Sequence, residues 1–299
     1  MSILLARDTA VIVQGFTGRT ASFHAGRMAG YGTAVTGGVA PGKGGSTHLD
    51  LPVFNTVRGA VQETGATASI VFVPPPFAAD AIMEAADAGI GLCVCVTHGI
   101  PAQDMMNAMR YLARTPEGER MILIGPSATG IITPGQASLG VMPGEIFRPG
   151  RVGLVSRSGT LGFEAAEQMT ARGIGVSSAV GIGSDPICGV SFGDVLRFFN
   201  DDADTDAVVM IGETDSAAEL NAARWARQYM TKPLVVYITE RQSRHGAATG
   251  HADAIIRAFA GPEPEQVGII RDLGHKIVPH PAAFGETIEN VISNLRSVA

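Results

Sequence analysis

Short apolar segments alternate with segments of helical periodicity along the whole chain. In the first part, apolar runs predict strands, and apolar positions three and four residues apart predict amphipathic helices. The predicted strands are residues 10–14, 33–36, 68–73, 91–97 and 121–125, and the predicted helices are residues 21–29, 57–64, 78–88 and 102–113. Repeated strand–helix units are typical of a parallel sheet with helices on both faces.

A glycine- and proline-rich stretch at residues 130–150 interrupts this pattern, which then restarts. The further predicted strands are residues 152–156, 176–180, 207–211, 234–238 and 276–279, and the further predicted helices are residues 160–172, 192–200, 217–229 and 283–296. The sequence therefore predicts an α/β protein with two doubly wound domains. These domains are residues 1–128 and 151–299, and residues 129–150 connect them.

Composition and charge exclude several classes of protein. The chain has 299 residues, of which 45% are hydrophobic and 17% are charged, as in a well-buried globular protein. Its net charge of −6 argues against a general nucleic-acid or anionic-membrane surface, so any anion site must be built locally. There is no signal pattern and no apolar run of membrane-spanning length, which predicts a cytoplasmic protein.

The three cysteines do not have the spacing of a metal site. Cys93 and Cys95 lie on one apolar predicted strand, and Cys188 is far from both in the sequence. This arrangement favours thiols buried in the core of a protein from a reducing compartment, with no bound metal.

The first candidate site follows the first predicted strand. Two glycines, Gly15 and Gly18, permit a tight turn and let a phosphate approach the start of the next helix. Their spacing is not that of the G-x-G-x-x-G dinucleotide motif. An NAD site also needs an acid after the second strand, whereas residues 37–45 contain no acid and carry Lys43. A ligand with an extra ribose phosphate, either CoA or NADP, suits this loop better. The alternative is a flexible loop with a solvated lysine.

A second strand-to-helix turn opens the second domain. Here the backbone amides and hydroxyls of Ser158, Gly159 and Thr160 predict an anion cradle, although the same residues also suit a simple helix cap. Ser158 as the nucleophile of a serine hydrolase is disfavoured, because the G-x-S-x-G elbow is absent.

His251 is a candidate phosphate carrier. It lies in a glycine-led turn before a helix-like run, and neutral imidazole is nucleophilic near neutral pH. Glu213 ends an apolar strand-like run, where a carboxylate could fix the imidazole tautomer. The alternatives are a structural histidine at a helix start and an exposed acid at a strand end.

Taken in order, these residues resemble the α subunit of succinyl-CoA synthetase and its relatives among the acid–CoA ligases. The resemblance covers nearly the whole chain and includes residues 14–18, 41–45, 51–57, 65–69, 156–161, 210–213 and 250–252. Residues 77–89 and 99–106 look closest to malate–CoA ligase.

The resemblance implies a Rossmann-like CoA-binding domain followed by a flavodoxin-like ligase domain. It implies a phosphohistidine at His251 beside Glu213, and phosphate binding by Ser158, Gly159 and Thr160. It also implies a partner, a β subunit with an ATP-grasp domain that binds ATP or GTP and Mg, in an αβ or α2β2 assembly. The residues that it implies for CoA are Thr17, Gly18, Arg19, Thr20, Lys43, Val96, Thr97 and His98.

The implied reaction makes a CoA thioester of a dicarboxylate, succinate or malate. His251 would accept the γ-phosphoryl group and pass it to a substrate carboxylate, and the CoA thiol would then attack the acyl phosphate. Phosphorylation supplies the leaving group that a free carboxylate lacks.

Several positions depart from the family pattern. Where the family has Gly-Pro-Asn-Cys, this chain has Gly-Pro-Ser-Ala-Thr at residues 125–129, and Phe163 replaces a tyrosine near the substrate. Asp215 and Ser216 replace a Gly-Gly pair, and residues 245–249 replace a basic segment before the histidine. The changes at Asp215 and in residues 245–249 keep open a CoA-binding module that has lost catalysis, and the loop at Lys43 keeps open an NADP-dependent reductase.

Overall fold

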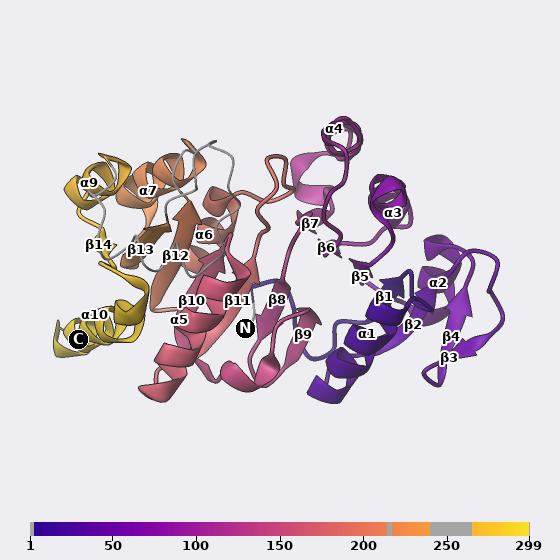
Figure 1. Ribbon diagram of the computed structural model, residues 1–299, viewed down its shortest axis with the longest axis horizontal. Helices are drawn as coiled ribbons and strands as arrows, with labels where there is room; N and C mark the ends of the chain where they lie inside the picture. Colours follow the sequence, from indigo (N-terminus) through magenta and orange to yellow (C-terminus); the bar gives the residue numbers. More distant parts are fainter. Residues whose placement is uncertain (1–2, 214–216, 240–264, 299) are drawn as a thin grey trace, which may run out of the picture. The chain divides into compact units, whose positions relative to one another are not determined.

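The computed structural model describes residues 3–213, 217–239 and 265–298 (Figure 1). The chain divides into two compact units. Leu4–Gly144 and Gly181–Val190 form the first unit, and Glu145–Val180 with the described residues from Ser191 onward forms the second. Each unit contains its own mostly parallel sheet, as the strand–helix alternation predicts.

The sheet of the first unit has the strand order β3-β4-β2-β1-β5-β6-β7. Only β3, which pairs with β4, is antiparallel to its neighbour. The strands are β1 (Val11–Gln14), β2 (Val35–Val39), β3 (Thr47–His48), β4 (Leu51–Phe54), β5 (Ala68–Val71), β6 (Leu92–Cys95) and β7 (Ile122–Ile124). The helices are α1 (Arg19–Tyr31), α2 (Val57–Thr64), α3 (Pro75–Asp87) and α4 (Ala102–Leu112).

Apart from β3, this order is that of the Rossmann fold. The chain moves outward from β1 through β2 to β4, then returns to the other side of β1 with β5, β6 and β7. The strand order therefore reverses at β1 and β5, and the carboxyl ends of these strands are where ligands of such sheets bind.

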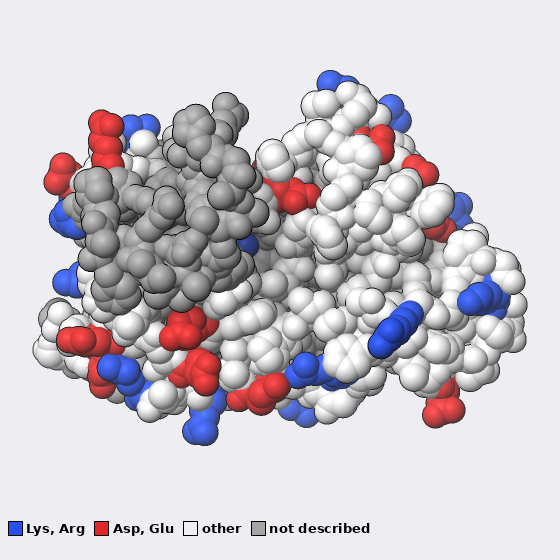
Figure 2. Space-filling model, viewed as in Figure 1, with Lys and Arg blue, Asp and Glu red and all other residues white. Residues whose placement is uncertain are grey.

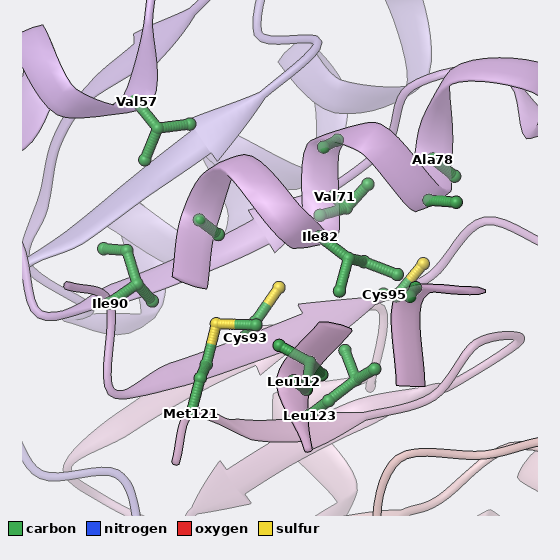
Figure 3. Packing of buried hydrophobic residues seen from close by; sticks show 14 of the residues in the cluster. Val57, Val71, Ala78, Ile82, Ile90, Cys93, Cys95, Leu112, Met121 and Leu123 are labelled. Atoms are coloured by element: carbon green, nitrogen blue, oxygen red, sulfur yellow. The ribbon is translucent and has the colours of Figure 1, made fainter. Parts of the chain in front are cut away.

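The core of the first unit packs α2, α3 and α4 against the sheet. Figure 3 shows Cys93 and Cys95 of β6 in the same apolar cluster as Ile82, Leu123 and Met121. Both thiols are unpaired and buried, and burial raises the pKa of Cys93 well above its usual range and that of Cys95 to about 12. The prediction of core thiols is confirmed for these two residues.

Within the described residues, the second sheet has seven strands in the order β14-β13-β12-β10-β11-β8-β9, of which the second unit supplies β14-β13-β12-β10-β11. This is the flavodoxin-like order, because β10, the first of these strands along the chain, lies between the second, β11, and the third, β12. The strands are β10 (Pro149–Ser156), β11 (Val176–Gly181), β12 (Ala207–Glu213), β13 (Leu234–Thr239) and β14 (Lys276–Ile277). The helices are α5 (Gly159–Ala171), α6 (Phe192–Asp201), α7 (Ala217–Tyr229), α9 (Glu265–Asp272) and α10 (Phe284–Val298).

The sequence pattern misses the short strands. Residues 129–150 contain an antiparallel pair, β8 (Gly130–Thr133) and β9 (Ala137–Gly140), that the glycine-rich composition conceals. A Cβ on Gly130 would lie 2.1 Å from the Leu139 carbonyl oxygen, so the two backbones approach each other closely there. The strand predicted at residues 33–36 runs instead from Val35 to Val39, because glycines in its second half hide the apolar pattern.

The described surface matches the modest net charge. On the face shown in Figure 2, Lys and Arg side chains are interspersed with Asp and Glu. None of the helices within the described parts of the chain is long and apolar enough to cross a membrane. Any anion site must therefore be formed locally, by the backbone N–H groups and basic side chains of particular loops.

Candidate functional site

The turn between β1 and α1 presents backbone N–H groups at the carboxyl edge of the first sheet. Gly15 has a φ of +78°, and its N–H donates to the Val39 carbonyl at 2.9 Å. Gly18 is the N-cap of α1 and supplies no side-chain cap, so the first N–H groups of the helix keep their donor capacity. With no acid in the first turn, this helix start is suited to an anion.

A glycine loop places Lys43 beside this helix start. Its ammonium donates to the Thr17 hydroxyl at 2.9 Å, so two predicted CoA residues are in contact. The side-chain oxygen of Asn55 accepts from the N–H groups of Gly42 and Gly44, both at 2.9 Å, and fixes the loop. Asn55 was not predicted as a site residue, because its only signal in the sequence is its position next to a strand end.

The residues predicted at positions 96–98 follow β6 at the same edge of the sheet. The Val96 N–H donates to the Val71 carbonyl at 3.2 Å, and the Thr97 hydroxyl donates to the Val73 carbonyl at 2.7 Å. These bonds tie the ends of β5 and β6 together, while His98 is exposed. The Ser127 N–H donates to the Thr97 carbonyl at 3.0 Å, which brings the altered loop to this edge.

Ser127 has a hydrogen-bond partner that the sequence did not reveal. Its hydroxyl donates to Asp185 Oδ1 at 2.6 Å, and its backbone has a φ of +57°. The Cys188 thiol donates to the backbone carbonyl of Asp185 at 3.1 Å. The loop that departs from the family pattern is therefore fixed by a second loop of the same unit.

In the second unit, the predicted anion cradle is also a capped helix. The Ser158 hydroxyl accepts from the Leu161 N–H at 3.3 Å, so it caps α5 as the alternative interpretation supposed. Gly159 and Thr160 follow as the first residues of α5, whose first turn carries no acid. The cap uses one N–H group and leaves others at this helix start for an anion.

Glu213 ends β12, and a carboxylate from α7 contacts its backbone. Its N–H donates to Glu219 Oε1 at 3.2 Å, and the same oxygen accepts from Arg157 Nε at 3.0 Å. Since β10 and β12 are neighbouring parallel strands, Ser158 and Glu213 follow adjacent strand ends. Glu219, which lies in the first turn of α7, was not predicted as a site residue.

The remaining predictions have different outcomes. Phe163 is half-buried in α5 and packs edge-on against Phe147, with 6.4 Å between the ring centroids. His251, Asp215, Ser216 and residues 245–249 lie outside the described residues. Among the described residues, no group of three His, Cys, Asp or Glu side chains could hold a metal ion.

Comparison with known families defines the class of protein. Residues 6–99 match the family described as CoA binding domain, and residues 149–271 match the succinyl-CoA ligase like flavodoxin domain. Together with the two sheet topologies, these matches define a CoA-binding subunit of an acid–thiol ligase.

Two similar proteins identify the family of this chain more narrowly. The chain is 52% identical to the malate–CoA ligase subunit alpha of Methylorubrum extorquens, over 98% of this chain and 99% of that protein. It is 47% identical to the ADP-forming succinate–CoA ligase subunit alpha of Aquifex aeolicus, over 98% of this chain and 95% of that protein. The chain belongs to the succinyl-CoA ligase α-subunit family, in which it is similar to both succinate–CoA and malate–CoA ligase subunits.

A solved structure shares the fold. ATP citrate lyase from Methanothrix soehngenii superposes with a TM-score of 0.82 at 22% identity over 98% of this chain. The chain spans about half the length of that protein, 51%.

Proposed function

We propose that this chain is the α subunit of a nucleotide-dependent ligase that makes a CoA thioester of succinate or malate through a phosphohistidine. The observation that carries the proposal is the pair of strand-end sites, Lys43 on Thr17 in the CoA-binding domain and Ser158 and Glu213 at adjacent strand ends in the ligase domain. Identity near one half to both kinds of relative supports a dicarboxylate and leaves both acids as substrates to test.

The first site has the donors that the phosphates of CoA need. It offers the uncapped N–H groups of α1, the Lys43 ammonium and the exposed Arg19 and Thr20 side chains. These residues, with Thr17, Gly18, Val96, Thr97 and His98, would bind CoA, which supplies the thiol of the product. The oxygen-rich phosphates would replace water at exposed donors, so little burial of charge is required.

The second site suits phosphoryl transfer. His251 attacks the γ-phosphorus and the nucleoside diphosphate leaves; a substrate carboxylate oxygen then takes the phosphoryl group from the imidazole. The CoA sulfur finally attacks the acyl carbon, which releases phosphate. Ser158, Gly159 and Thr160 would hold the phosphoryl oxygens, and Glu213 would orient the imidazole.

The partner in this proposal is a β subunit with an ATP-grasp domain, in an αβ or α2β2 assembly. It binds the nucleotide and Mg²⁺, and the ADP-forming relatives favour ATP over GTP. The assembly is cytoplasmic, which agrees with the unpaired thiols of the core.

Labelling of the assembled enzyme tests the proposed function. The chain is co-expressed with its β subunit, purified as a complex and incubated with γ-labelled ATP or GTP and Mg²⁺. We expect an acid-labile, base-stable label on this chain, and its release when CoA and either succinate or malate are added. A complex that binds CoA but takes no label would instead support a module without catalysis, and tight NADPH binding without label would support a reductase.

Replacing Lys43 by methionine tests the CoA site. We expect the KM for CoA to rise about tenfold with little change in kcat, because one charge-assisted contact to phosphate is lost. The difference should shrink at high salt, where exposed charges are screened. Arg58→Met, at an exposed cation on α2, is the matched control. An unchanged KM for CoA in Lys43→Met would remove Lys43 from the site.

A further inference from the structure

A buried ion pair joins the carboxyl end of β10 to the first turn of α7. Arg157 Nε donates to Glu219 Oε1 at 3.0 Å, with the Glu219 side chain fully buried and 15% of the Arg157 side chain exposed. Arg157 directly follows β10, and its backbone N–H donates to the Ile211 carbonyl of β12 at 3.0 Å. Arg157 therefore fixes the chain immediately before Ser158 through both its backbone and its side chain.

The same carboxylate also holds the end of β12. Glu219 Oε1 accepts from the Glu213 N–H at 3.2 Å. Gly212 provides the space for this contact, since a Cβ there would lie 2.3 Å from Glu219 Cγ. One buried oxygen thus sets the backbone of Glu213 relative to Arg157.

The cost of this arrangement indicates a role beyond stability. A buried ion pair pays a large desolvation penalty, and apolar replacements of similar volume are often as stable or more stable. Glu219 Oε2 is buried and has no hydrogen-bond partner within the described parts of the chain, which adds to the penalty. The ion pair therefore contributes little to the free energy of unfolding. It does, however, fix the positions of the α5 start and of the end of β12, which carry the predicted phosphate-site residues.

We infer that Arg157 and Glu219 are positioning residues for phosphoryl transfer. They hold the α5 start at Ser158 and the backbone of Glu213, which carries the predicted carboxylate, in a fixed mutual arrangement, without touching the substrate themselves. This inference rests on the proposed function. Small displacements of groups around a reacting phosphoryl are enough to slow transfer by about 10–100-fold.

Three variants of the co-purified complex separate positioning from stability. Glu219→Gln keeps the shape and an acceptor oxygen but removes the charge. The double variant Arg157→Met/Glu219→Leu replaces the whole pair by apolar side chains. Asp206→Asn is the matched control, because the exposed Arg151–Asp206 pair, 2.6 Å apart, joins the opposite ends of the same two strands.

The measurements are the single-turnover rate of phosphorylation from labelled ATP, the KM for CoA and the midpoint of thermal unfolding. We expect Glu219→Gln to be phosphorylated at least about tenfold more slowly, with the KM for CoA unchanged. The double variant should unfold near the wild-type temperature and still be slow, while Asp206→Asn should keep the wild-type rate.

Wild-type phosphorylation in Glu219→Gln would overturn the inference. A double variant that regains the wild-type rate together with its stability would also overturn it, since the pair would then be structural only. Should the double variant not fold, the rate of Glu219→Gln decides the question. If the wild-type complex itself takes no label, the proposed function is contradicted. That outcome differs from failure of this inference, in which the wild-type complex is labelled and the variants are labelled at the same rate.

Discussion

Replacing His251 by alanine is expected to abolish the acid-labile label on the chain and to lower thioester formation by about 10³-fold or more. A covalent carrier divides one difficult displacement into two easier ones, and removing it leaves only binding and orientation to accelerate the reaction. Binding of CoA should be unaffected, because the predicted CoA residues lie in the other domain. Phosphoenzyme formation and steady-state turnover of the assembled complex measure the effect.

His245→Ala provides the control for this experiment, since it removes another imidazole from the same part of the sequence. That variant should retain both label and turnover. Glu213→Gln should lie between the two, because an amide can still hydrogen-bond the imidazole but no longer stabilises its charged form. Label that persists in His251→Ala would mean that a different residue carries the phosphoryl group.

Most helices and strands could be predicted from the sequence because their apolar residues recur at regular spacing. The predicted bounds of helices 57–64 and 217–229 are those of α2 and α7, and each predicted strand overlaps an observed one. The sheet order was not available from alternation alone, because the same pattern is compatible with several ways of placing parallel strands. Family resemblance supplied the Rossmann-like and flavodoxin-like topologies, and both are confirmed.

The candidate sites were predictable where they depend on local sequence. The turns that end at Gly18 and Ser158 are strand-to-helix connections, and in the structure these two residues are the N-caps of α1 and α5. Lys43 was assigned to the first phosphate site from its loop sequence, the resemblance added Thr17, and the structure brings the two side chains together at 2.9 Å. Their roles in binding remain predictions.

Glu219 could not be found in this way because its environment is made by distant residues. An acid in the first turn of a helix is usually exposed and complements the helix dipole. Its burial depends on Arg157, 62 positions earlier, and on the missing side chain of Gly212. Gly212 was the available signal, since a glycine inside an apolar strand often marks a close approach.

Replacing Gly38 by alanine is expected to destabilise the CoA-binding domain and weaken CoA binding together. A Cβ at Gly38 would lie 2.2 Å from Phe16 Cγ, and Phe16 is fully buried, so it has no solvent-exposed space to move into. Overpacking of this kind costs about 3 kcal/mol of unfolding free energy, or roughly 6–12 °C in the midpoint of a domain this size. Thermal unfolding and the KM for CoA are the measurements.

The binding effect follows from the position of Phe16 in the phosphate turn. Phe16 lies between Gly15 and Thr17, so its displacement moves the Thr17 hydroxyl that accepts from Lys43. Gly26→Ala, at an exposed site of α1 where a Cβ meets nothing within 4 Å, should instead be neutral or stabilising by up to about 1 kcal/mol. Adding Phe16→Leu to Gly38→Ala should recover part of the lost stability, because it relieves the clash. If Gly38→Ala left the unfolding midpoint and the KM for CoA unchanged, Phe16 would not be the residue that anchors the turn.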